Sequence, residues 1–169
     1  TIADLSAEGQ PVPQHAGWDV IRTMAVDLKR SGRAGGGGFY DYPAEGRKTL
    51  WAGLRQAYPP LEPQPAIEEL KTRLLYIQAL EAARCYEEGV LRSVQEADLG
   101  SILGWGFPAY TGGTLSFIDT LGPARFVAEC KRLAKRYGER FKPTKCLLER
   151  ARNGETYHAG AAPTAAQAS

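Results

Sequence analysis

Apolar residues recur at helical spacing along most of the chain. The longest such segment is AIEELKTRLLYIQALEAARCYEEG, about residues 66–89, which contains no proline. Ile67, Leu70, Leu74 and Ile77 share one face of a helix, and Leu80 broadens that face. So wide a face predicts a central helix that packs on more than one side.

The same periodicity predicts six further helices. They cover about residues 17–30, 46–57, 93–106 and 114–122, and two more begin near residues 123 and 143. Ser93 and Glu96 form a capping box at the start of one of them, and Pro123 suits the first turn of another. Only FYDY, residues 39–42, alternates like a strand, and it is too short to found a sheet. The pattern therefore predicts an all-α protein.

Proline and glycine mark the expected boundaries. Four prolines within residues 59–65 make a stiff connector, and residues 1–16 read as an arm. We expect residues 1–64 to be a linker or extension with two helices and a glycine-rich GFYDY segment. Residues 65–157 then form one compact helical domain, and residues 158–169 a disordered tail. The chain begins at Thr1 rather than Met, which suggests a part of a longer or processed protein.

Composition narrows the class of protein without identifying it. The 169 residues are 43% hydrophobic and 24% charged, with a net charge of +2. This balance excludes a fibrous or wholly disordered chain and gives no field that would predict nucleic acid as a partner. The apolar runs are shorter than the ~20 residues of a membrane span, and no targeting signal is visible.

Cysteine and histidine give weak signals for chemistry. Cys85, Cys130 and Cys146 are odd in number and widely spaced, so we expect buried free thiols in a reducing compartment. His15 and His158 lie near opposite ends of the chain, which favours surface or loop histidines over a catalytic pair. We expect no catalytic, cofactor-binding or metal-binding residue in this chain.

Two glycine-rich segments invite functional interpretations. The run at residues 35–38 has no preceding strand and no following Lys-Ser or Lys-Thr, so a flexible turn is favoured over a phosphate loop. WGFPAYTGG, residues 105–113, predicts a sharp chain reversal. Its aromatic density makes it the best candidate for an interface.

Charged positions also have structural explanations. Lys131, Arg132, Lys135 and Arg136 repeat on one helix face, as a solvated surface does. Glu81 could be a partly buried acid or base, but an ion pair with Arg84 is favoured. Asp119 has the same two interpretations, and the structural one is again favoured.

Three segments in order carry a resemblance to a known family. SGRAGGGGFYDY, TRLLYIQALEAARCYEEG and GWGFPAYTGGTLSFIDTLG together resemble the C-terminal helical region of 3-hydroxyacyl-CoA dehydrogenases. The closest likeness is to the last domain of the multifunctional α-subunit of fatty-acid β-oxidation complexes. Gly32-Arg33 and residues 38–42 match that family's GRKxGxGFYxY segment, whereas residues 34–37 depart from it. The resemblance covers about residues 30–157.

The resemblance implies that the catalytic parts of such a protein lie elsewhere. The multifunctional α-subunits that this chain resembles carry an enoyl-CoA hydratase domain, a Rossmann domain that binds NAD, and two related helical domains. The first helical domain opens its long helix with N-R-L-L, whose Asn belongs to the dehydrogenase site, but this chain has Thr72-Arg73-Leu74-Leu75. Thr72 lacks the amide's paired donor and acceptor. The departure points to the non-catalytic second copy.

The resemblance further implies the partners. They are the preceding Rossmann and helical domains of the parent, with NAD and acyl-CoA bound there and a thiolase subunit as a further candidate partner. We expect the long helix and residues 105–119 to form an internal interface that mimics a dimer partner. The expected location is the bacterial cytoplasm, or the mitochondrial matrix or a peroxisome in a eukaryote. A free-standing helical interaction module, without any enzyme, stays open as the alternative.

Overall fold

The computed structural model describes residues 16–158. The chain divides into two compact units, residues 1–64 and residues 65–169, and each is described by itself. Helices dominate the described residues, which confirms the mainly helical class. His15 and residues 159–169 of the expected tail lie outside the described residues.

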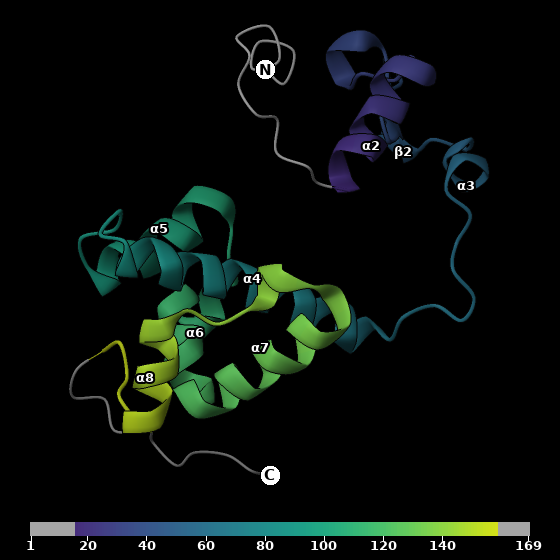
Figure 1. Ribbon diagram of the computed structural model, residues 1–169. Helices are drawn as coiled ribbons and strands as arrows, with labels where there is room; N and C mark the ends of the chain where they lie inside the picture. The colour runs from purple at the N-terminus through teal and green to yellow at the C-terminus, as the bar shows by residue number, and fades with distance from the viewer. Residues whose placement is uncertain (1–15, 159–169) are drawn as a thin grey trace, which may run out of the picture. The chain divides into compact units, whose positions relative to one another are not determined.

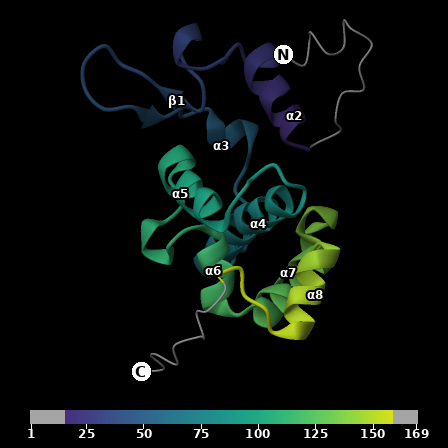
Figure 2. The same cartoon turned by 90° about the vertical axis from the view of Figure 1, so that its left-hand side faces the viewer.

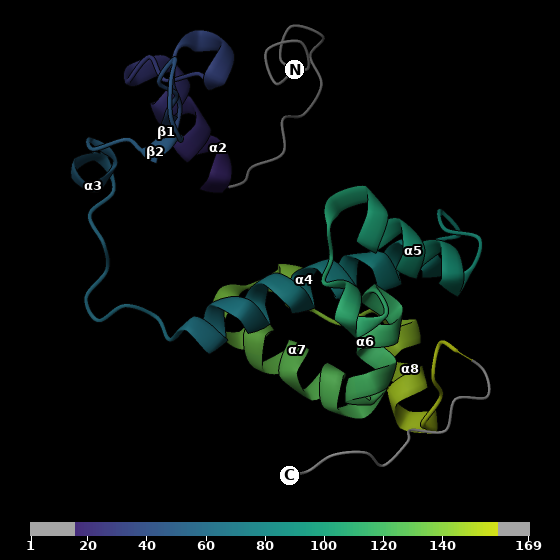
Figure 3. The same cartoon turned by 180° about the vertical axis from the view of Figure 1, so that it is seen from behind.

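The first unit contains less helix than its sequence predicts. Its helix α2 (Ala16–Arg22) continues into a wider π-helical turn (Thr23–Asp27) that buries Met24. Strands β1 (Tyr40–Asp41) and β2 (Thr49–Leu50) pair in antiparallel fashion, and α3 (Leu54–Ala57) follows. Figure 3 shows this pair beside α2.

The expected helix over residues 46–57 is therefore wrong except for its last turn. Gly46 adopts a φ of +99°, which lets the chain reverse after Tyr42, and Leu50 then pairs with Tyr40. The Trp51 amide donates to the Phe39 carbonyl at 3.0 Å and extends the pairing. Residues 49–50, which the periodicity assigns to a helix, instead form the strand that pairs with the FYDY segment.

Arg30 organises the glycine-rich turn of this unit. Its Nε donates to the Gly38 carbonyl at 2.7 Å, its guanidinium forms an ion pair with Asp41, and it lies 4.4 Å from the centre of the Trp51 ring. A Cβ at Gly37 would come within 2.7 Å of the same guanidinium. The glycine run is thus a structural turn folded around an arginine.

The second unit is a cluster of helices around one core (Figures 1 and 2). Its elements are α4 (Ile67–Glu87), α5 (Val94–Trp105), a 3₁₀ turn η3 (Ala109–Thr111), α6 (Thr114–Leu121), α7 (Pro123–Tyr137), a 3₁₀ turn η4 (Glu139–Phe141) and α8 (Lys145–Asn153). Helix α4 packs on α6, α5 packs on α6, and α8 packs on α7.

The core of the second unit lies between α4, α6 and α7. Tyr76 of α4 stacks on Phe126 of α7 with ring centres 4.6 Å apart, and Phe117 meets both rings edge-on. The fully buried aliphatic side chains around them are Leu80, Leu115, Ile118, Leu133 and Leu147. Burial of each such side chain stabilises the fold by about 1.5–3 kcal/mol.

Local signals in the sequence place the helix starts. The Ser93 hydroxyl accepts the Glu96 amide at 3.1 Å, as the capping box predicts, and Pro123 occupies the first turn of α7. Thr144 caps α8 by accepting the Leu147 amide. The cysteines agree only in part with the sequence: Cys130 is buried and Cys85 half-buried, but Cys146 is exposed, because it lies on the outer face of the short α8.

Candidate functional site

An exposed apolar stripe runs along the first half of α4. It consists of Ile67, Leu70 and Leu74, which lie one turn apart, and Leu74 is 63% exposed. The opposite face of the same helix carries the buried Tyr76, Ala79, Leu80 and Ala83. Helix α4 is therefore apolar on two sides, as its sequence predicts, but the second unit covers only one of them.

Aromatic residues at the end of α5 and in the turn after it extend this stripe. The Trp105 indole N–H donates to the Gln78 side chain at 3.0 Å, one turn beyond Leu74, and Trp105 is 56% exposed. Tyr110 is 87% exposed, and it adds a small contribution to the raised pKa of the Lys71 amine, which is due mainly to the hydrogen bond with Glu68. We call the surface formed by Ile67, Leu70, Leu74, Trp105 and Tyr110 the α4 face.

Phe107 does not belong to this face. It is 2% exposed and its ring meets Phe117 edge-on with centres 6.0 Å apart. The expected interface over residues 105–119 is thus incomplete. Trp105 and Tyr110 point outward, whereas Phe107 fixes the turn to the core.

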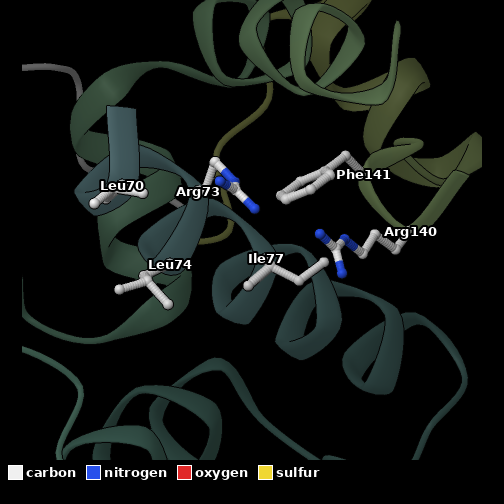
Figure 4. Close-up of a pocket in the computed structure, with 6 residues that line it drawn as sticks. All are labelled: Leu70, Arg73, Leu74, Ile77, Arg140 and Phe141. Carbon is white, nitrogen blue, oxygen red and sulfur yellow. The ribbon is translucent and has the colours of Figure 1, made fainter. Parts of the chain in front are cut away.

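An open pocket of about 390 Å³ borders the α4 face. Leu70, Arg73, Leu74 and Ile77 of α4 line one wall, and Arg140 and Phe141 of η4 line the other (Figure 4). Its two polar side chains are both arginines.

A buried carboxylate joins α5, α6 and the end of the described chain. Asp98 of α5 accepts the backbone amides of Leu115 at 2.7 Å and Ser116 at 3.2 Å. It also accepts the Ser116 hydroxyl at 2.6 Å and contacts His158 Nε2 at 2.8 Å. A Cβ at Gly113 would lie 2.4 Å from the Asp98 Cβ, so only glycine lets α6 begin this close to α5.

The three side chains have the composition of a hydrolytic triad but not its geometry. In such a triad the imidazole lies between serine and carboxylate and uses a different nitrogen for each. Here the same His158 nitrogen faces both Asp98 and Ser116, and the serine hydroxyl donates directly to the carboxylate. Although His158 Nε2 lies 3.1 Å from the Ser116 oxygen, the serine proton is directed at Asp98, so the imidazole does not bridge a serine and a separate carboxylate. The arrangement instead caps the N-terminus of α6 with a negative charge, which stabilises a helix.

The sequence missed this cluster because its members are 18 and 60 residues apart. His158 lies in a loop, as expected, but the expected start of a disordered tail at this residue is wrong, because Asp98, Ser116 and Asp119 hold it through contacts that depend on the tertiary fold. The position of Asp98 within a helical repeat next to small residues was the only available signal.

Asp119 and Glu81 both have structural roles. Asp119 accepts the amides of Tyr157 at 2.8 Å and His158 at 2.9 Å, so it anchors the chain after α8 instead of forming an ion pair. Glu81 is exposed and forms the expected ion pair with Arg84. Thr72 donates its hydroxyl to the Glu68 carbonyl at 2.8 Å, one turn back in α4.

Part of the basic face of α7 is neutralised. Arg132 bonds both Glu129 on its own helix and Glu69 of α4, at 2.6 Å for the closest Glu69 contact. Tyr137 donates its hydroxyl to Glu69 at 2.8 Å. Both hydrogen bonds lower the pKa of the Glu69 carboxyl, and the bond from Arg132 has a larger effect than the bond from Tyr137. The face therefore ties α7 to α4.

Two kinds of feature are absent from residues 16–158. Within that range no group of three His, Cys, Asp or Glu side chains could hold a metal ion. None of the helices there is both long and apolar enough to cross a membrane.

These features describe a mainly helical domain with an uncovered apolar face on α4. No family model matches the chain. It is 34% identical over 163 residues to the fatty acid oxidation complex subunit alpha of two Vibrio cholerae serotype O1 strains, classical Ogawa 395 and El Tor Inaba N16961. The match covers 92% of this chain and 23% of each relative, so the chain spans about a quarter of their length. The resemblance to α-subunits of fatty-acid oxidation complexes is confirmed.

Proposed function

We propose that this chain is a non-catalytic helical domain of a multifunctional β-oxidation enzyme. It supports an NAD-dependent 3-hydroxyacyl-CoA dehydrogenase by packing against the preceding helical domain, as the second subunit does in a two-subunit enzyme. Enoyl-CoA hydratase activity, NAD and acyl-CoA binding then belong to the rest of the parent. The likeness to subunit alpha supports this proposal, and the α4 face is the observation that carries it.

The exposed side chains of the α4 face supply the energy of the proposed contact. A soluble domain rarely leaves a row of aliphatic and aromatic side chains uncovered, and such a row marks a contact surface. Covering Ile67, Leu70 and Leu74 would stabilise an assembly by about 1–2 kcal/mol each, since each is only partly exposed. Trp105 and Tyr110 are residue types enriched where interfaces are strongest.

The chemistry of the buried cluster fits a supporting role. The Asp98 carboxylate is occupied by two amides, a hydroxyl and an imidazole, and its work is to hold α6. We therefore expect this chain alone not to oxidise NADH with acetoacetyl-CoA. Turnover by the purified chain that scales with its concentration would disprove this.

The test is Leu74→Asp in the full-length protein that contains this chain. We expect lower dehydrogenase activity and a lower melting temperature, with hydratase activity retained, because the aspartate places a charge in the contact. Val90→Asp is the matched control, since Val90 is equally exposed but lies in the turn after α4. Phe107→Ala is not diagnostic, because its loss would damage the core.

Equal dehydrogenase activity and melting temperature in the wild-type and Leu74→Asp proteins would refute the proposal. A free-standing interaction module predicts something different: this chain would self-associate, and Leu74→Asp would make it monomeric. Sedimentation of the isolated chain measures that outcome.

A further inference from the structure

Two arginines in the α4 pocket lack an acidic partner. Arg132 and Arg84 of the same unit both form ion pairs with carboxylates. Arg73 and Arg140 form none with the described residues, and no carboxylate lines their pocket. Figure 4 shows both side chains extending toward the space beside the Phe141 ring.

Arg73 is the more unusual of the two. Its guanidinium stacks on the Tyr137 ring at 4.1 Å, and its Nε is buried without a hydrogen-bond acceptor. Buried donors are satisfied in the great majority of cases, since an unpaired one is costly. That nitrogen is itself enclosed, but Arg73 as a whole is half-buried and lines the pocket, so an acceptor from outside this unit can reach its guanidinium there.

Resting on the proposed function, we infer that the segment covering the α4 face is an apolar helix carrying an Asp or Glu that pairs with Arg73 and Arg140. Leucine-sized side chains of this helix lie over Leu70 and Leu74, and its carboxylate enters the pocket. A guanidinium presents donors in a planar fork that suits a carboxylate. The ion pair fixes the register in which the apolar surfaces meet, which apolar contact alone does not do.

A protein segment fits this surface better than a small amphiphile does. Ligand sites enclose most of the ligand surface, whereas this pocket is open and continuous with the exposed Leu74 and Ile67. The α4 face is an extended apolar stripe, and the pocket with its two arginines lies at the side of that stripe. That shape matches a helix with one acidic position.

The first experiment locates the covering segment. The photocrosslinking residue p-benzoylphenylalanine replaces Leu74 in the full-length protein, and the crosslinked peptides are mapped by mass spectrometry. We expect a helical segment elsewhere in the same polypeptide, with an Asp or Glu within one turn of the attachment point. Attachment to a second copy of the protein, or to a segment without a carboxylate, would overturn the inference.

The second experiment tests the charges. We expect Arg73→Glu combined with Arg140→Glu to lower the crosslinking yield at least fivefold. Replacing the partner's Asp or Glu, once it is located, with Lys should restore the yield in this double variant. Arg125→Glu is the control, because Arg125 is exposed on α7 outside this pocket and should stay within twofold of wild type. Arg140→Glu alone keeps the test valid if the Arg73 change disturbs Tyr137, and it should lower the yield at least twofold.

The outcomes separate this inference from the proposed function. If Leu74→Asp impairs the dehydrogenase but the arginine variants leave the crosslink unchanged, the domain contact stands and the acidic partner is wrong. Saturable binding of oleate to the full-length protein, lost in the double arginine variant, would assign the pocket to a fatty-acid anion and overturn the inference.

Discussion

Replacing Asp98 with alanine should destabilise the second unit more than any other single loss of a polar side chain there. The Asp98 side chain is 8% exposed and holds the first turn of α6 through the amides of Leu115 and Ser116. Alanine removes both acceptor oxygens and the negative charge at the helix N-terminus. The amide of Leu115 then has no acceptor within the protein.

The magnitude follows from these separate losses. A lost N-cap acceptor costs about 1 kcal/mol, the charge at the helix end up to about 1 kcal/mol, and a buried unpaired amide about 1–3 kcal/mol. We expect Asp98→Ala to lower the free energy of unfolding by about 2–5 kcal/mol. Asp98→Asn should cost only about 1–2 kcal/mol, because its oxygen can still accept an amide and its NH₂ can donate to Ser116 or His158. His158→Ala should cost about 1 kcal/mol, since water can reach that site.

Urea unfolding followed by far-ultraviolet circular dichroism measures the order of these variants. With a slope of about 2 kcal/mol per molar urea, Asp98→Ala should lower the midpoint by about 2 M. Hydrogen exchange at the Leu115 and Ser116 amides adds a local readout and should accelerate in the same order. A loss below 1 kcal/mol for Asp98→Ala, or an equal loss for His158→Ala, would refute the capping explanation.

Three further predictions test other parts of the second unit. Because the pKa of the Glu69 carboxyl is lowered in the folded protein, its ionised form stabilises the fold at pH values above the usual pKa near 4.5, and this contribution is lost as the pH falls through the lower pKa of the folded state. Glu69→Gln should therefore flatten the acid side of a curve of stability against pH. An unchanged curve would contradict this. Burial raises the pKa of the Cys130 thiol to about 12, so a thiol reagent at pH 8 should label the exposed Cys146 first and Cys130 only on unfolding, as peptide mapping would show. Gly113→Ala should lower the free energy of unfolding by about 2–4 kcal/mol because its φ is +117° and its Cβ would clash with α5, whereas the control Gly100→Ala, in the open interior of a helix, should raise it by about 0.5–1 kcal/mol.

Helices with a strong local signal could be predicted from the sequence. The periodicity of α4, the capping box at Ser93 and the proline of α7 act within a few residues, and the structure contains all three. The helix over residues 46–57 was wrong because strand pairing across a turn with Tyr40 replaced the local preference. Pairing of this kind depends on a partner distant in sequence, which periodicity does not report.

The surface could be predicted less well than the core. The sequence indicated that α4 is apolar on two sides and that the turn at residues 105–113 carries aromatics. It could not say that Phe107 turns inward while Tyr110 turns outward, because side-chain direction in a turn depends on the packing of α6. The unpaired state of Arg73 was likewise invisible, since the absence of a partner is a property of the whole fold.

The anchoring of residues 157 and 158 has a consequence for the order of events during synthesis. Asp119 and Asp98 receive their last hydrogen bonds from residues that leave the ribosome some 40 and 60 positions later. Helices α4 to α7, and the cap that Asp98 provides to α6, can therefore be complete while the contacts from residues 157 and 158 are still missing. A nascent chain stopped before residue 157 would carry a loosened α6, so this unit reaches its full stability only when the segment after α8 has been made.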